Sequence, residues 1–205
     1  MKNIDRTVVA LALMSCLAAA PVALARKKNA STEPGKYKDW KGEIDELEIV
    51  RTFKLADYER IAIQGLDTRT TPLPEKDDNT YEPVQQVLTN IEGPLARGLE
   101  RELGSRTVEV EASDKKGAGV LIVTGVVEEM NPGSKAARYW AGFGAGAAGS
   151  RLAIEVQDGE TGEVLLRIVQ ERRSGVGAFG GDYVELLERN LEAIGADLAL
   201  VLGSF

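Results

Sequence analysis

The sequence RLAIEVQDGETGEVLLRIVQE, residues 151–171, says most about how this chain folds. Apolar and polar side chains alternate on both sides of its centre, as they do in strands that bury one face. The centre, Asp158–Gly162, is a five-residue connection with two glycines, and connections of this kind join the strands of β-hairpins. The stretch therefore predicts two antiparallel strands. We interpret its acidic centre as a hairpin loop rather than a cation site, because Asp and Glu are common in such loops.

Apolar runs elsewhere predict further strands. The run Val120–Val123 is apolar on both faces, which is typical of a central strand that is covered on both sides. A turn at Asp114–Gly117 joins the strand that contains this run to the strand before it. The four further segments that we expect to form strands are residues 47–55, 60–68, 106–113 and 118–131.

Two segments show the spacing of three and four residues that marks amphipathic helices. The first runs from Val84 to Leu103, and Gly93–Pro94 is expected to kink or divide it. The second follows Asp182, a residue type that caps helix N-termini. Together the elements predict an α+β fold, in which a mostly antiparallel sheet of about five or six strands is packed by two amphipathic helices.

The first 25 residues have the features of a secretory signal peptide. Lys2 and Arg6 flank the start of an apolar run, and Ala23 and Ala25 occupy the small-residue positions of a cleavage site. The run is rich in alanine and interrupted by proline, so export with cleavage is preferred to a transmembrane anchor. Residues 13–16, LMSC, also resemble a lipobox, in which Cys16 becomes a lipidated first residue.

The chain is expected to have three parts. Residues 1–25 are the signal peptide, residues 26–45 are a basic, polar and flexible tether, and residues 46–205 are a single α+β domain. The expected location is the periplasm or the outer membrane.

Two residue types that carry much of enzyme chemistry are scarce or absent. Cys16 is the only cysteine, and the chain has no histidine. Cleavage after Ala25 therefore leaves no disulfide, no imidazole base and no Cys/His zinc site, and we assign no catalytic residue, cofactor or metal. The formal net charge of −7 disfavours nucleic acid as a partner. A non-enzymatic protein is favoured, and the alternative is a carboxylate-based hydrolase that acts on envelope glycans.

Residues 140–150, WAGFGAGAAGS, are unusually rich in glycine and alanine. Gly144, Gly146 and Gly149 match the spacing of a dinucleotide-binding loop, but a strand rather than a helix is expected to follow them. Nucleotide binding is therefore not expected. One alternative is a tight crossover that leads into the hairpin, where glycine lets the backbone turn back near the sheet.

The more specific alternative is that these residues contact a membrane or another protein molecule. Small residues four apart allow close packing, and aromatic residues favour membrane interfaces, although the segment is too short to span a bilayer. Self-association into a homo-oligomer or peripheral membrane contact would follow. The candidate contact residues are Tyr139, Trp140, Gly142, Phe143, Gly144, Gly146 and Gly149.

The block NPGSKAARYWAGFGAGAAGSRLAIEVQDGETGEVL, residues 131–165, preceded by KLADYERIAIQGLDT, residues 54–68, resembles a bacterial envelope family known as domain of unknown function 4410. Its members are similar to secreted proteins or lipoproteins with a basic, glycine-rich segment before an acidic hairpin. The resemblance covers roughly residues 47–202 and implies export and a single domain, but no activity. The chain departs from the lipoprotein members in its poor lipobox. We expect an exported accessory or interaction protein whose protein or envelope partner is unknown.

Overall fold

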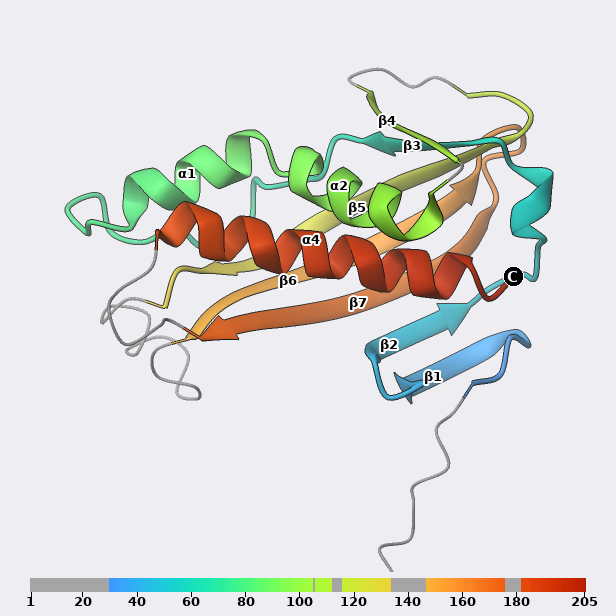
Figure 1. The fold of residues 1–205 in the computed structure, drawn as a ribbon, viewed down its shortest axis with the longest axis horizontal. Coiled ribbons are helices and arrows are strands. Elements are labelled where there is room, and N and C mark those ends of the chain that lie inside the picture. The colour runs from blue at the N-terminus through green and yellow to red at the C-terminus, as the bar shows by residue number, and fades with distance from the viewer. Residues whose placement is uncertain (1–29, 105, 112–115, 134–146, 176–181) are drawn as a thin grey trace, which may run out of the picture.

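The computed structural model describes residues 30–104, 106–111, 116–133, 147–175 and 182–205. Within these residues, seven strands form one sheet and three α-helices pack against it (Figure 1). The prediction of a mixed fold with a mostly antiparallel sheet is confirmed. The expected counts were too low: one strand, β1, lies in the presumed tether, and the first predicted helix is two helices.

The sheet has the strand order β1-β2-β7-β6-β5-β3-β4. All neighbours are antiparallel except β3, which runs parallel to both β5 and β4. The strands are β1 (Gly35–Trp40), β2 (Ile44–Ile49), β3 (Arg60–Gln64), β4 (Thr107–Glu111), β5 (Val120–Asn131), β6 (Ala147–Asp158) and β7 (Val164–Gly175). The predicted hairpin is the pair β6 and β7, in which Ile154 lies opposite Ile168.

Two details of the sheet differ from the sequence-based expectation. β4 and β5 are not paired neighbours, because β3 lies between them. Residues 35–45, expected in the flexible tether, form β1 and the start of β2. The polar composition of β1 hides its role as a strand: Lys36 and Lys38 form ion pairs with β2, and Trp40 at its end is fully buried.

The helices are α1 (Tyr81–Thr89), α2 (Glu92–Leu103) and α4 (Tyr183–Leu202), with a short 3₁₀ turn at Leu55–Asp57. The predicted division of the first helix is confirmed. Pro94 is the third residue of α2, where its missing N–H would have had no intrahelical partner. Asp182 caps α4 as expected, since its carboxylate accepts a hydrogen bond of 2.9 Å from the Val184 N–H.

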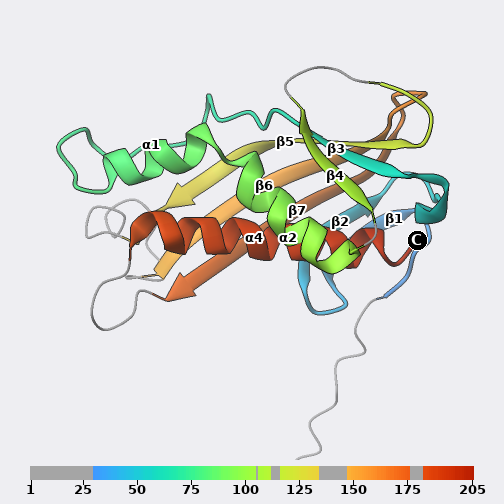
Figure 2. The ribbon, with the colours of Figure 1, turned by 45° about the horizontal axis from the view of Figure 1, so that its top comes forward.

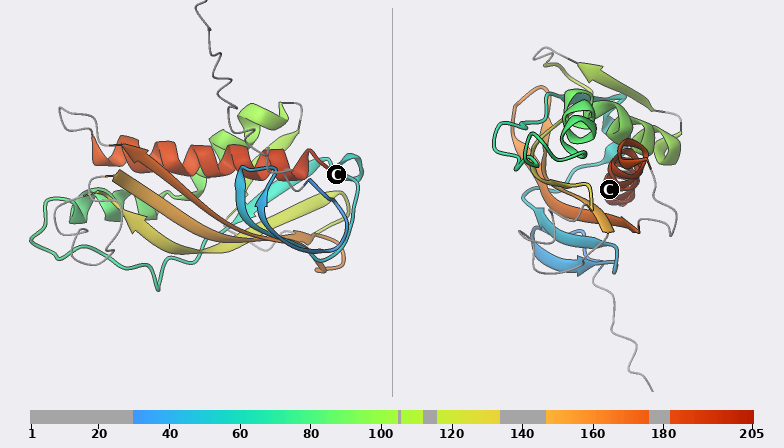
Figure 3. Two further views of the ribbon diagram at one scale, coloured as in Figure 1. Left: turned by 90° about the horizontal axis from the view of Figure 1, so that it is seen from below. Right: turned by 90° about the vertical axis from the view of Figure 1, so that its left-hand side faces the viewer.

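The helices all lie on one face of a strongly curved sheet, with α4 beside α1 and α2 (Figures 2 and 3). The main core fills the space between the two layers. The run Val120–Val123 is buried throughout: Leu121 and Val123 join the main core, whereas Val120 and Ile122 form a small cluster with Ala62. No helix in the described part of the chain is long and apolar enough to cross a membrane.

Helices α2 and α4 touch through their backbones. A Cβ atom placed on Gly98 of α2 would lie 1.9 Å from the carbonyl oxygen of Glu192 in α4. A Cβ atom on Gly195 of α4 would lie 2.2 Å from the carbonyl oxygen of Leu95 in α2. Both distances are well below van der Waals contact, so each helix needs glycine where it meets the other.

We expect Gly98→Ala and Gly195→Ala each to lower the free energy of unfolding by about 2 kcal/mol or more, because the helices must move apart. Alanine would otherwise stabilise a helix by about 1 kcal/mol relative to glycine, so the sign of the change reports the clash. Urea denaturation followed by circular dichroism measures the effect. Gly65→Ala is the control, since nothing lies within 4 Å of its added methyl group. Equal stability of all three variants would contradict the close crossing.

Candidate functional site

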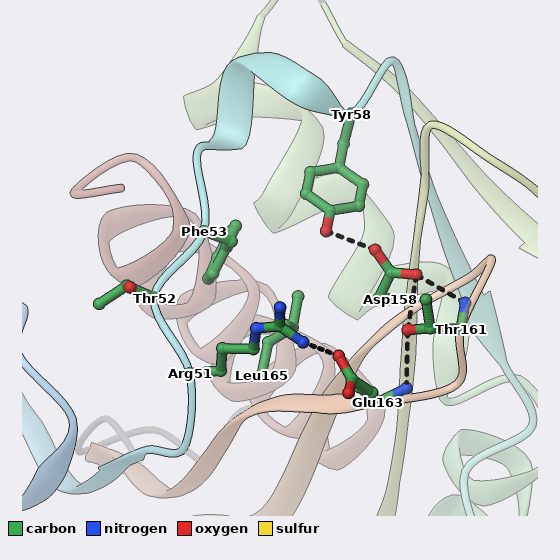
Figure 4. A pocket seen from close by; sticks show the side chains of 8 residues that line it. All are labelled: Arg51, Thr52, Phe53, Tyr58, Asp158, Thr161, Glu163 and Leu165. Atoms are coloured by element: carbon green, nitrogen blue, oxygen red, sulfur yellow. Dashed lines mark hydrogen bonds and ion pairs between the residues drawn. The ribbon is translucent and has the colours of Figure 1, made fainter.

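A small polar pocket lies beside the loop that joins β6 and β7 (Figure 4). Its volume is about 180 Å³, and its lining comes from the segment before β3, from the loop and from the start of β7. The lining residues are Arg51, Thr52, Phe53, Tyr58, Asp158, Thr161, Glu163 and Leu165.

The central pair of the pocket is Tyr58 and Asp158. The Tyr58 hydroxyl donates a 2.7 Å hydrogen bond to one carboxylate oxygen of Asp158 (Figure 4). The other oxygen accepts from the backbone N–H groups of Glu160 and Thr161, at 3.0 and 2.7 Å, and from the Thr161 hydroxyl. Asp158 therefore holds the hairpin loop in shape and ties it to the chain before β3.

Electrostatics at this pair follow from these contacts. Burial, and then the hydrogen bond to Asp158, raises the pKa of the Tyr58 hydroxyl well above its usual value. The same hydrogen bond, together with the backbone donors of the loop, lowers the pKa of the Asp158 carboxyl. A general acid at neutral pH needs a raised carboxyl pKa, so the shift of Asp158 is opposite to that requirement.

The rest of the pocket is also held by contacts within the protein. Arg51 forms an ion pair with Glu163 across its mouth (Figure 4). The ring of Phe53 stacks on that of Phe205 with centroids 4.7 Å apart, and meets Tyr58 edge-on at 5.9 Å. Among the described residues, no group of three or more acidic, cysteine or histidine side chains is placed to hold a metal ion. These contacts therefore hold the hairpin loop, the segment before β3 and the C-terminal residues together.

A second region of interest is the opposite end of β5, β6 and β7, where the glycine-rich segment begins and ends. Asn190 of α4 is only 1% exposed and joins two of these strands. Its amide nitrogen donates to the carbonyl oxygen of Ala148 at 3.0 Å, and its amide oxygen accepts from the Ser174 hydroxyl at 2.5 Å. Ser150, fully buried in β6, contacts the sulfur of Met130 in β5 at 3.3 Å. This end of the sheet is therefore fixed to α4 by buried polar contacts.

One predicted contact residue lies in this fixed region. Gly149 is in β6, where it pairs with Asn131 of β5 and Arg173 of β7. The strand thus begins at Ala147, earlier than the expected start at Arg151. The other candidate residues lie outside the described residues, as do Cys16, Ala23 and Ala25: they are Tyr139, Trp140, Gly142, Phe143, Gly144 and Gly146.

A buried ionic cluster under α4 was missed by the sequence analysis. Asp197 is 7% exposed and receives two hydrogen bonds from the guanidinium of Arg172, which raise the pKa of that arginine. Gln170 donates to the same carboxylate at 2.8 Å and accepts from the Asp45 N–H at 2.9 Å. The available signal was the seven-residue spacing of Asn190 and Asp197, which puts both polar residues on the apolar side of α4.

Comparison with known families identifies the chain. The model of the family described as "Domain of unknown function (DUF4410)" matches residues 58–178, more than half of the sequence. The chain belongs to the DUF4410 family. The match begins at Tyr58 and includes β3 to β7, both ends of the glycine-rich segment and the pocket pair Tyr58 and Asp158.

Several solved structures are similar to this DUF4410 protein. A PelC dodecamer from Paraburkholderia phytofirmans has 14% identity and a TM-score of 0.44, over 73% of this chain and 96% of that chain. A Xanthomonas campestris protein described as DUF330 has 10% identity and a TM-score of 0.41, over 75% and 91%. A hypothetical protein from Chlamydia trachomatis has 12% identity and a TM-score of 0.36, over 71% and 99%. No curated protein matches the sequence.

We expect Tyr58→Phe to lower the free energy of unfolding of the DUF4410 protein by about 1–2 kcal/mol, because it removes a hydrogen bond to a charged carboxylate. Chemical denaturation at neutral pH measures the change. Tyr81→Phe is the matched control, since the Tyr81 hydroxyl meets only the exposed side chain of Gln85. A loss as large in Tyr81→Phe would contradict the role of the Tyr58 contact.

The pH dependence of stability tests Asp158 separately. The folded protein lowers the pKa of this carboxyl below its unfolded value of 3.8, so its contribution is full above that pH and is lost as the pH falls through the folded pKa. We therefore expect Asp158→Asn to be less stable than the wild type at pH 7 and to lose less stability on acidification below about pH 4. Thermal unfolding from pH 7 to pH 2 measures how the stability of each protein changes with pH. The same pH dependence in the wild type and in Asp158→Asn would contradict the prediction.

Proposed function

We propose that this DUF4410 protein is an exported envelope protein that acts by contact with another macromolecule, through the glycine-rich aromatic segment, residues 139–149. The observation that carries the proposal is the fixed sheet end from which this segment starts and to which it returns. The connection that contains this segment leaves β5 after Asn131 and enters β6 at Ala147. Asn131 pairs with Gly149 in these antiparallel strands, so both ends of the connection are held by the same ladder. A binding segment gains from a rigid base, because less conformational freedom is lost on contact.

The buried contacts of Asn190 explain why that base is rigid. Truncating this side chain would leave the Ala148 carbonyl and the Ser174 hydroxyl without a buried partner, which is costly. A second connection, residues 176–181 with sequence VGAFGG, leaves the same end of the sheet after β7. It again combines glycines with an aromatic residue, here Phe179, and this similarity supports a contact role for that end of the molecule.

Export is the other half of the proposal, and it rests on the N-terminal sequence. Lys2 and Arg6, the apolar run and the small residues Ala23 and Ala25 support cleavage by signal peptidase and release into the periplasm or onto the outer membrane. Lipidation at Cys16 is the alternative route to the same compartment and would anchor the protein directly.

Contact rather than catalysis is the mode of action that we propose. A chain cleaved after Ala25 has neither a thiol nor an imidazole to act as nucleophile or base. The carboxylate-based alternative requires two carboxyl groups with different protonation states, one with a raised pKa. The pocket supports no such pair, because the pKa of Asp158 is lowered and Glu163 is paired with Arg51.

We expect the triple variant Tyr139→Ser, Trp140→Ser and Phe143→Ser to lose at least half of its membrane-bound or oligomeric fraction, because the apolar anchors are removed. Cell fractionation measures the membrane-bound fraction, and native mass measurement of the purified protein measures the oligomeric fraction. Substitution is better than deletion of the whole segment, since Ala147 to Gly149 are part of β6.

The matched control is the double variant Leu73→Ser and Leu200→Ser, which removes exposed apolar side chains elsewhere on the surface. It should leave fractionation and mass unchanged. If the triple variant fractionates and assembles like the wild type, the segment is not the contact site and this proposal fails.

The exported state predicts the mass of the protein purified from cells that express the full chain. We expect a polypeptide that starts at Arg26, because cleavage follows Ala25. Intact-mass spectrometry distinguishes this product from a chain that starts at an acylated Cys16. A cytoplasmic protein that retains residues 1–25 would overturn export.

A further inference from the structure

The two edges of the sheet differ in how they are protected. β1 forms one edge, and Lys36 and Lys38 project from it with side chains 81% and 85% exposed. The segment before β1 also returns onto it, since the Trp40 indole donates to the Ser31 carbonyl at 2.8 Å and the Tyr37 hydroxyl donates to that of Glu33 at 2.7 Å. Lysines and an adjoining segment are common ways to prevent an edge strand from pairing with another chain.

The opposite edge, β4, has different features. It pairs with β3 on one side and with no strand on the other among the described residues. None of its five residues is a lysine or proline, and Val110 is 53% exposed although it lies on the same side of the strand as Val108, which packs against the core. The charged residues of β4 are Glu109 and Glu111, and Glu109 forms an ion pair of 3.2 Å with Arg60 of β3. The exposed, β-branched Val110 makes this edge suited to pairing with a further strand.

We propose that β4 pairs with β4 of a second copy of this chain, antiparallel, about a two-fold axis that passes midway between the Val108 residues of the two copies and stands perpendicular to the sheet. Such an axis keeps the helices of both copies on the same face and joins the two sheets into one. A two-fold interface needs a surface that is complementary to itself. Side chains that lie directly opposite each other in an antiparallel pair are in contact, so the complementarity can be checked residue by residue.

The charges of β4 select this register. With the axis at Val108, Thr107 of one copy lies opposite Glu109 of the other, and Val110 lies opposite Arg106. A hydroxyl thus meets a carboxylate, and an apolar side chain meets the stem of an arginine whose guanidinium donates to the Tyr58 carbonyl. Moving the axis to Glu109 would place two glutamates directly opposite each other, which is unfavourable. Moving it to Thr107 would bring Arg106 opposite Val108 and shorten the paired stretch.

This surface is separate from the glycine-rich segment. β4 lies at the upper right of Figure 1, whereas the ends of β5 and β6 that carry the segment lie at the left. The inference therefore goes beyond the proposed function, and either surface can fail its test while the other passes.

The test compares two substitutions at one exposed position. Val110→Lys places a second cation opposite Arg106 of the other copy, whereas Val110→Glu places a carboxylate there. Because each contact occurs twice in the dimer, we expect the lysine variant to dissociate at a roughly tenfold higher concentration than the glutamate variant. Analytical ultracentrifugation of the protein purified from cells that express the full chain, over a range of concentrations at low salt, measures the difference.

Thr107, which is exposed, provides an independent pair of variants with the opposite charge preference. Thr107→Glu faces Glu109 of the second copy and should weaken the dimer, whereas Thr107→Lys should not. Leu73→Lys is the control, since this exposed leucine lies outside the sheet and its change should leave the dimer intact.

The proposal is supported if the wild type forms dimers or multiples of dimers and the sign of the charge effect reverses between positions 110 and 107. It is overturned if the wild type is monomeric, because the edge then serves another partner or none. Equal effects of lysine and glutamate at both positions also overturn it, since they show that charge across the two-fold axis plays no part.

Discussion

The backbone contact between α2 and α4 sets the distance between these two helices, and the rest of the architecture depends on that distance. Gly98 and Gly195 allow the two helices to approach until carbonyl oxygens of one meet Cα atoms of the other. The pair is then narrow enough for both helices to lie within the curve of one sheet, where their apolar sides meet the main core. A wider pair would lift one helix off the strands and expose part of that core.

Buried polar groups then fix where α4 lies along the sheet. Apolar packing alone is tolerant of sliding, whereas Asn190 and Asp197 have specific partners on β6 and β7. Moving α4 by one turn would leave both residues unpaired in the core, at a cost of several kcal/mol. Asn190 also holds the start of β6, in which the glycine-rich segment ends, and the end of β7, so one side chain serves both the fold and the proposed contact site.

Local sequence patterns predicted the local elements well. The alternation around Asp158–Gly162 gave the β6–β7 hairpin, Gly93–Pro94 indicated a divided helix, and Asp182 marked the start of α4. Features that depend on distant residues were not predictable in this way. The position of β3 between β4 and β5 depends on pairing between segments that are far apart in the sequence. The lysines of β1 made it resemble a tether, because their glutamate partners in β2 become visible only in the folded sheet. The pocket pair was equally hidden, since Tyr58 and Asp158 are 100 residues apart.

The pairing of β2 with β7 has a consequence for the order in which the chain can fold. Glu46 lies opposite Val169, so the sheet brings together residues from the two ends of the domain. Neither β2 nor the hairpin that it forms with β1 has its final neighbour until the last third of the polypeptide has been synthesised. High contact order of this kind makes folding slow, because a long loop must close before the contact stabilises it. A newly made chain thus lacks its complete sheet until β7 has been synthesised, a state that suits the export that we propose.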